Sequence, residues 1–269
     1  MRRLATIALA TIACGTIAAH AQSLAFAYSK GATYHYTFHE TVDLSVDTVF
    51  GTQPMKYDIK AKQAVTVNSV DSAGIADLGV TLTDVSLTTT ANNDTTTTTQ
   101  STLPTIDIKI AKDGTVVSSN AATVLTDNKF SVAGGGSMES AVLPDKAVKP
   151  GDTWSKSYDE PSPYGGGTIR VTANSKYLRD ETFHGVQAAV VETTTAANID
   201  VTDDSGNSAL TIKGTATSDV TTWIDPTAHR LLKTWVRSNS QITYSSTTIL
   251  GPQGSVTWKG PVNLDLEPA

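Results

Sequence analysis

The chain has 269 residues, a formal net charge of −6 and only 17% charged residues. This balance, without any cluster of Lys and Arg, argues against nucleic-acid binding, which requires basic side chains that neutralise phosphates. Threonine and serine supply much of the polarity, and β-branched threonine suits a half-exposed strand. The composition therefore favours a sheet.

The N-terminus has the pattern of an export signal. Met1-Arg2-Arg3 is followed by an apolar or small run from Leu4 to Ala18, and Ala19-His20-Ala21 matches the small-x-small cleavage rule. The run is too short and too weakly hydrophobic for a transmembrane helix, and no later segment approaches the required length. The sequence predicts a signal peptide over residues 1–21 and a periplasmic or extracellular mature protein without a transmembrane segment.

The single cysteine, Cys14, lies inside this signal. Lipid anchoring through Cys14 is the disfavoured alternative, because Thr11 stands where lipoprotein signals prefer a leucine-like residue. If Cys14 is removed with the signal, the mature chain has no thiol, which excludes disulfides and thiolate catalysis.

Alternation with a period of two dominates the first half. Tyr34, Tyr36 and Phe38 share one predicted strand face, and Met55, Tyr57, Ile59 and Ala61 share a second, which Val65 and Val67 continue. The threonine-rich stretch from Thr88 to Ser101 fits either a mobile loop or an exposed strand with a flexible connection; we expect the strand.

A linker runs from Asn120 to Pro150. Ala121 to Phe130 fits a short helix, and Gly134-Gly-Gly-Ser137 a flexible joint. We place the boundary here, with a first β-rich half at 22–142 and a second at 143–269. Because pairing the two free edges would protect both, we expect one continuous body.

The second half alternates in the same way, with Ile169, Val171, Ala173 and Tyr177 on one face. Val220, Thr222 and Ile224 share another, whereas both faces look partly apolar from Leu231 to Val236. One buried and one wet face is typical of antiparallel sheets.

Three landmarks recur in the same order in the two halves. Gly31-Ala-Thr-Tyr34 matches Gly151-Asp-Thr-Trp154, Gly74 matches Gly185, and the turn Asp113-Gly114 matches Asp225-Pro-Thr-Ala-His229. The repeat predicts an all-β fold of long antiparallel strands in a curved sheet or open barrel, built from two similar halves with a short helix near the central linker.

The segment Leu143-Pro-Asp-Lys-Ala-Val-Lys-Pro-Gly-Asp-Thr-Trp154 resembles a motif of uncharacterised exported bacterial β-rich proteins, many of them lipoproteins. Those proteins carry a leucine-proline pair, then V-x-x-G-D-x-W, and later a D-x-x-x-G/H-R-L turn, here Asp225 to Leu231. The resemblance implies a turn, a strand start and a buried tryptophan, but no activity. Ala228-His229 replaces the usual turn glycine, which leaves the turn geometry open.

The histidines do not form a convincing metal or catalytic site. His35 and His39 are four apart, a spacing that on a strand separates them by roughly 13 Å. We therefore expect them to be solvent-facing polar positions. His184 and His229 fall in predicted turns. A zinc site built from distant loops is the disfavoured alternative.

Other catalytic patterns are equally weak. Ser137 lacks the closing glycine of a G-x-S-x-G elbow. The pair Asp159-Glu160 opens a predicted Pro- and Gly-rich loop, and Glu192 is expected to point outward from a strand. Asp203 to Asn207 lacks the spacing of a calcium loop, so we interpret it as a hairpin turn.

Trp154, Trp223, Trp235 and Trp258 are interpreted as core anchors rather than as a sugar-binding platform. We assign no catalytic, cofactor or metal residues and predict a non-catalytic exported protein, structural or binding a small hydrophobic ligand in the concave face of its sheet. Its partner would be that ligand or an envelope component. A surface adhesin or partner-binding module is the alternative, and a polymer-acting hydrolase the last choice.

Overall fold

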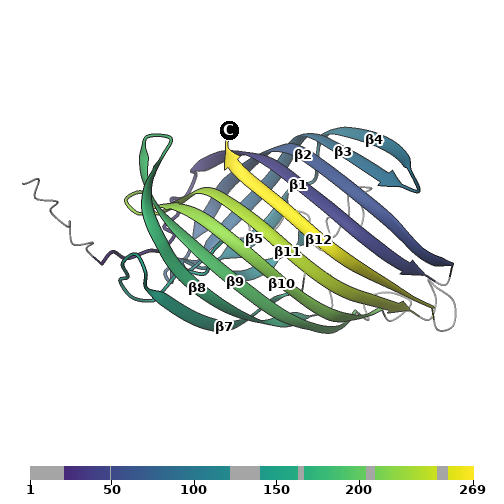
Figure 1. Cartoon of the computed structure of the whole chain (residues 1–269). Coiled ribbons are helices and arrows are strands. Elements are labelled where there is room, and N and C mark those ends of the chain that lie inside the picture. Colours follow the sequence, from purple (N-terminus) through teal and green to yellow (C-terminus); the bar gives the residue numbers. More distant parts are fainter. Residues whose placement is uncertain (1–20, 49, 122–139, 163–166, 204–209, 247–253) are drawn as a thin grey trace, which may run out of the picture.

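The regular structure of this protein is a single curved antiparallel sheet, seen in a computed structural model (Figure 1). The sheet confirms the predicted all-β fold of a curved sheet or open barrel. The structure describes residues 21–48, 50–121, 140–162, 167–203, 210–246 and 254–269. The predicted signal peptide and the expected helix from Ala121 to Phe130 lie outside these ranges, apart from their last and first residue, respectively.

The strands are long, as the alternating stretches predict. They are β1 (Thr33–Thr48), β2 (Gly51–Val70), β3 (Ala76–Ala91), β4 (Asp94–Thr102), β5 (Ile106–Ile110), β6 (Val116–Ser119), β7 (Thr153–Pro161), β8 (Thr168–Phe183), β9 (Val186–Asp203), β10 (Leu210–Asp225), β11 (Arg230–Ser246) and β12 (Gly254–Pro268).

The strand order in the sheet is β6-β5-β3-β2-β1-β12-β11-β10-β9-β8-β7. β4 and β5 pair with successive stretches of β3, so β4 is an additional edge strand. β6 and β7 stand at the two ends of this order. The sheet curls into an open barrel (Figure 1), and β6 lies beside β7 across its seam.

The sequence repeat is visible in this order. The first half contributes β6-β5-β3-β2-β1 and the second contributes β11-β10-β9-β8-β7, with β12 between them. The matching landmarks fall at matching places: before β1 and β7, at the turns from β2 to β3 and from β8 to β9, and at the turns from β5 to β6 and from β10 to β11. The landmarks of the predicted repeat therefore take equivalent places along the sheet order.

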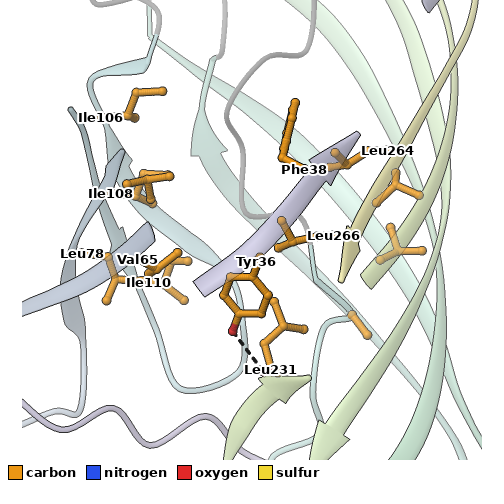
Figure 2. Packing of buried hydrophobic residues seen from close by; sticks show 14 of the residues in the cluster. Tyr36, Phe38, Val65, Leu78, Ile106, Ile108, Ile110, Leu231, Leu264 and Leu266 are labelled. Atoms are coloured by element: carbon orange, nitrogen blue, oxygen red, sulfur yellow. Dashed lines mark hydrogen bonds between the residues drawn. The ribbon is translucent and has the colours of Figure 1, made fainter. Parts of the chain in front are cut away.

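Side-chain alternation places one face of the strands inside the curve, and Figure 2 shows this for residues of β1, β2, β3, β5, β11 and β12. Tyr36 and Phe38 of β1 are each 4% exposed, and they pack in one cluster with Leu264 and Leu266 of β12. The Tyr36 hydroxyl donates a hydrogen bond of 3.0 Å to the Leu231 carbonyl of β11. Burial of each such large side chain contributes about 1.5–3 kcal/mol to folding, so the predicted faces form the core.

Two inward glycines allow neighbouring strands to approach closely. A Cβ on Gly214 of β10 would lie 2.1 Å from the Gln241 carbonyl oxygen, and one on Gly260 of β12 would lie 1.9 Å from the Asp43 carbonyl oxygen. Only glycine fits at such contacts, which let a long sheet bend into a barrel.

Two segments outside the sheet close one end of the barrel; we call residues 21–32 and 140–150 the N-terminal and central plugs. They join each other through backbone hydrogen bonds between Gln22 and Val148 in both directions. The Phe26 amide donates to the Lys112 carbonyl at 2.7 Å, and the Leu143 amide to the Asp113 carbonyl at 2.8 Å. Both plugs therefore contact the turn between β5 and β6.

The threonine-rich stretch forms strand rather than loop. It covers the end of β3 and most of β4, joined at Asn92-Asn93, which both have positive φ (52° and 69°). Asparagine tolerates this conformation, which two-residue hairpins require. Thr95 to Thr99 are exposed along the whole run, as the exposed-strand prediction has it.

Candidate functional site

The concave face carries two separate apolar clusters. The larger one is the core described above, and the smaller one, here called the second cluster, comprises Ile169, Val171, Ile199, Val201, Ile212 and Ile242. Tyr158, Ala197, Ala216 and Tyr244 pack against it, and burial raises the pKa of Tyr244 to about 12. Every member comes from β7 to β11 of the second half.

The two clusters differ in what covers them. The main core includes Leu24 and Phe26 of the N-terminal plug and Ala141 and Leu143 of the central plug, which form a second layer over the sheet. In the part of the chain that the structure describes, the second cluster has no member from outside the sheet. Its six members are nevertheless buried, with 0–7% of each residue exposed, so they form a compact apolar cluster on the inner face.

The inner face also holds two buried polar side chains that sequence reasoning missed. Glu40 is 1% exposed between Phe38 and Val42 on β1, opposite Ile59 and Leu264, and Gln63 on β2 is 4% exposed. One signal in the sequence could have located Glu40. It falls in the same alternate positions as the apolar residues of β1 and therefore shares their face of the strand. These residues give the interior an acidic and an amide position.

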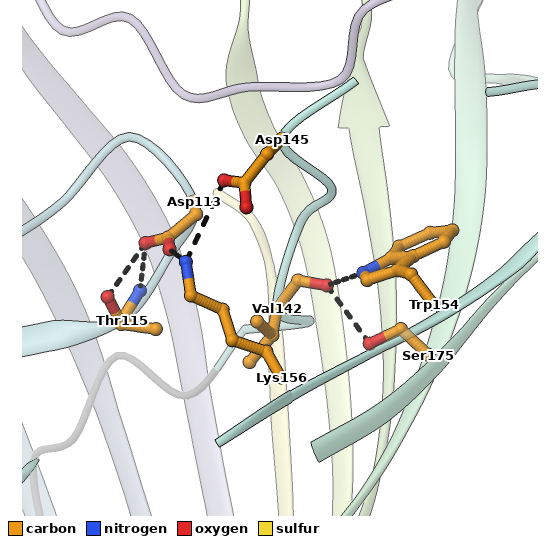
Figure 3. Close-up of polar contacts among 7 residues, drawn as sticks. All are labelled: Asp113, Thr115, Val142, Asp145, Trp154, Lys156 and Ser175. Carbon is orange, nitrogen blue, oxygen red and sulfur yellow. Dashed lines mark hydrogen bonds and ion pairs between the residues drawn. The ribbon is translucent and has the colours of Figure 1, made fainter. Parts of the chain in front are cut away.

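The seam between β6 and β7 is bridged by an ion pair (Figure 3). Lys156 of β7 contacts Asp113 of the β5–β6 turn, and Asp145 lies 3.8 Å from the same ammonium. Burial raises the pKa of Asp113, but hydrogen bonds from Lys156 and Thr115 outweigh it and hold that pKa below its ordinary value. The hydrogen bond to Asp113 raises the pKa of Lys156. We call this pair the seam ion pair.

Buried hydroxyls of the second half bind the central plug. The Val142 carbonyl accepts hydrogen bonds from Trp154 Nε1 at 2.8 Å and Ser175 Oγ at 3.0 Å. The Val142 amide donates a hydrogen bond to Thr193 Oγ1 at 3.1 Å, and the Ala141 amide donates one to Thr222 Oγ1 at 2.7 Å. These polar side chains on the inner face therefore satisfy the backbone of the central plug, which forms no strand pairing at Ala141 and Val142.

A groove of about 330 Å³ lies at the plugged end, where the two halves meet. Residues 33–36 of β1 form one side, and Phe183, His184 and Val186 of the β8–β9 hairpin form another. Residues 230–232 of β11 and Pro268 of β12 complete it. The second half contributes more of the lining than the first, and Arg230 is the permanently charged residue in it.

The four histidines of the described residues come from separate elements, although His35 and His184 line the same groove. His39 lies 3.5 Å from Asp58, and His229 Nδ1 lies 3.2 Å from the Ala25 carbonyl oxygen. His184 and His229 occupy turns with positive φ, 47° and 53°. His229 thus takes the conformation of the usual turn glycine and also holds the N-terminal plug. Among the described residues, no group of three or more His, Cys, Asp or Glu could hold a metal ion.

The carboxylate candidates separate rather than converge. The prediction of a loop at Asp159-Glu160 is wrong, because both residues belong to β7, where adjacent side chains point to opposite faces. Asp159 pairs with Arg170 across β7 and β8 at 3.2 Å. Glu192 points outward and is exposed, as predicted. Ser137 and residues 204–207 of the expected hairpin turn lie outside the described residues.

The tryptophan prediction holds for one residue and fails for two. Trp154 packs against the main core. Trp223 and Trp235 instead lie on the outward face of β10 and β11, because they alternate with the buried Thr222, Ile224 and Thr234. A cation lies over each ring: Lys233 Nζ is 5.3 Å from the Trp223 ring centroid, and Arg237 Cζ is 4.5 Å from that of Trp235. The Trp258 side chain lies outside the described part.

Comparisons with known proteins add little. The chain matches no described protein family and no curated protein. Two of the similar solved structures each share 10% sequence identity with this chain. DynF from the dynemicin biosynthesis pathway of Micromonospora chersina gives a TM-score of 0.26, covering 100% of this chain and 92% of DynF. A domain assigned to outer membrane lipoprotein sorting, from Vibrio parahaemolyticus, gives 0.15, covering 84% and 83%. Scores this low carry no functional argument.

Proposed function

We propose that the protein is a non-catalytic, exported binding protein that holds a small hydrophobic ligand on the concave face of its sheet. The observation that carries the proposal is the second cluster, an aliphatic stretch of the inner face of β7 to β11 that is separate from the main core. Its side chains are 0–7% exposed, so a ligand would have to displace what lies against them. An apolar molecule on the concave face would contact these aliphatic side chains.

Export is part of this proposal and rests on the N-terminal sequence pattern, Met1 to Ala21. In the described residues, no helix has the length and apolar character needed to cross a membrane. Mass measurement of the protein recovered from culture medium or periplasm tests the export step, with a mature chain beginning at Gln22 as the expected result.

The binding proposal is tested with an uncharged fluorescent apolar probe, N-phenyl-1-naphthylamine, and with native mass spectrometry of detergent-free protein. Ala197→Phe places a ring against the second cluster, whereas Ala196→Phe, its neighbour on β9, points outward and is the matched control. We expect Ala197→Phe to weaken probe binding about tenfold, a difference of about 1.4 kcal/mol. Ala196→Phe should change it by less than about twofold.

Two results would overturn this function. One is wild-type protein that carries no small molecule and does not bind the probe. The other is equal probe binding by both alanine variants, which would place the probe elsewhere. Thermal melts of both variants show whether each retains its fold.

An exposed edge supports a second candidate, a partner-binding module. Among the described strands β4 pairs only with β3, and Thr95 to Thr99 are exposed on both faces of the strand. Such an edge offers unpaired backbone donors and acceptors to an added strand. A fluorescein-labelled peptide copying residues 94–102 is the probe: saturable anisotropy supports strand addition, and an unchanged signal up to the peptide's solubility limit counts against it.

A further inference from the structure

The groove between the two halves is lined by two kinds of side chain. Phe183 and Val186 of the β8–β9 hairpin, the buried Leu232 and Pro268 supply an apolar part. His35, His184 and Arg230 supply a cationic or cation-capable part. No Asp or Glu is among the described residues that line it. The groove therefore combines an apolar wall with positive charge.

The Arg230 guanidinium has a hydrogen-bond donor that no described residue uses. Its Nε is buried without a hydrogen-bond partner among the described residues, and its nearest carboxylate oxygen, Asp225 Oδ2, is 3.7 Å away, beyond hydrogen-bond range. The other oxygen of Asp225 already accepts hydrogen bonds from the Thr227 and Ala228 amides, at 3.0 Å and 2.8 Å. Asp225 thus organises its turn and forms an ion pair, but no hydrogen bond, with Arg230, whose side chain is 41% exposed and lines the groove.

The two imidazoles lie at the same groove and are exposed. His184 is fixed by its hairpin turn, and its ring lies 4.4 Å from that of Phe183 between centroids. Within the described ranges neither imidazole forms an ion pair with a carboxylate, whereas His39, on the same strand as His35, faces Asp58. A turn alone explains why His184 is tolerated, but it does not explain three such side chains at one groove.

We propose that this groove binds a small amphipathic anion, a carboxylate on an aliphatic or aromatic body. The carboxylate accepts hydrogen bonds from Arg230, because a guanidinium group favours two parallel hydrogen bonds to the two oxygens of a carboxylate. His184 and His35 flank it, and the apolar body lies along Phe183 and Leu232. A volume near 330 Å³ is at the small end of ligand sites, which suits a fatty acid of medium length or an aromatic acid. This site shares no residue with the second cluster.

Octanoate and 1-octanol, a matched pair with and without charge, test the proposal by titration calorimetry. Arg230→Gln should weaken octanoate binding at least roughly tenfold, because a charge-assisted hydrogen bond is lost. Arg170→Gln, an exposed arginine paired with Asp159 on β7, is the control and should bind octanoate as the wild type does. His184→Asn keeps a residue that tolerates the turn and should weaken octanoate binding by a smaller factor. Binding of 1-octanol should not depend on Arg230.

Several outcomes would overturn the inference: no octanoate binding, octanoate binding that ignores Arg230→Gln, or equal losses for octanol and octanoate. Arg230→Lys keeps the charge and should retain part of the octanoate affinity, which separates loss of the site from misfolding of the Gln variant. Ala197→Phe separates the two proposals. Octanoate binding that is sensitive to Ala197→Phe and not to Arg230→Gln assigns it to the second cluster and refutes the groove.

Discussion

Two edge strands of the sheet, β7 and β4, are handled in opposite ways. β7 carries three charged residues, Lys156, Asp159 and Glu160, and is tied across the seam by the seam ion pair and by the central plug. β4 is a run of exposed threonines with one charge, Asp94, at its end, and among the described strands it pairs with β3 alone. Edge strands normally need charges, proline or a cover to prevent association. The difference indicates that β7 belongs to the closure of the barrel, whereas β4 keeps one unpaired edge in the described structure.

The largest expected effect on stability is at the β5–β6 turn, which both plugs contact. Gly114 has φ +88°, and a Cβ there would lie 2.7 Å from Ser140 Oγ and 2.9 Å from the Ala141 carbonyl oxygen. We expect Gly114→Ala to lower the free energy of unfolding by about 2–5 kcal/mol, from backbone strain plus overpacking. Urea denaturation measures the loss.

Gly74→Ala is the matched control for this substitution. Gly74 has φ +84°, but a Cβ at this position would meet no heavy atom of the described structure within 4 Å, so only the strain of about 1–2 kcal/mol remains. Equal losses in the two variants would mean that the plugs do not press on the β5–β6 turn.

A smaller effect is expected when the seam ion pair is broken. Asp113→Asn keeps an acceptor for Thr115 but removes the charge facing Lys156, which should cost about 1.5–3 kcal/mol. Because the pKa of Asp113 is lowered in the folded state, its contribution is present above the ordinary carboxyl pKa and is lost as the pH falls through the lowered value.

Unfolding measured from pH 7 down to pH 2 checks the sign. Wild-type stability should fall faster than that of Asp113→Asn below about pH 4, so that the two curves converge. Asp159→Asn, at the exposed pair with Arg170, is the control, with a change of at most about 1 kcal/mol. Parallel curves for wild type and Asp113→Asn would show that the pair does not stabilise the seam.

The smallest effect on stability is expected at the bare edge. Thr96→Lys on β4 should change the free energy of unfolding by less than about 0.5 kcal/mol, since Thr96 is exposed and its side chain makes no described hydrogen bond. The same change should abolish binding of the 94–102 peptide, because an edge lysine opposes strand addition. Ala196→Lys, exposed on the doubly paired β9, should leave peptide binding intact; if it also abolishes binding, β4 is not the docking edge.

Alternation and turn residues sufficed to predict much of the fold. Tyr36, Phe38, Val171 and Ile224 are buried where the period of two puts them. The prediction failed where both faces of a strand carry large residues. Near the bulge at Trp223/Ile224, Leu231 and Leu232 are both buried, and the tryptophans lie outside. Local periodicity does not report which face is concave when a bulge shifts the register.

The groove and the plugs were harder to predict. His35 and His184 were noticed only as a strand and a turn residue, because nothing in the sequence brings β1 near the β8–β9 hairpin. The central plug was interpreted as a linker, since its residues satisfy their backbone through side chains such as Thr193 and Thr222 rather than through a strand pattern. Contacts between segments far apart in sequence leave no local signal.

The position of β12 has a kinetic consequence. The final strand pairs with the first one, so that Asn263 and Thr41, 222 residues apart, are in hydrogen-bond contact at the middle of the sheet. Contacts of such separation require the closure of very long loops and slow the search for the native state. Until β12 arrives, β1 and β11 each have an open edge, so the two halves remain unjoined at that side during synthesis. In an exported chain, as proposed for this protein, the sheet would be completed only after β12 has been delivered.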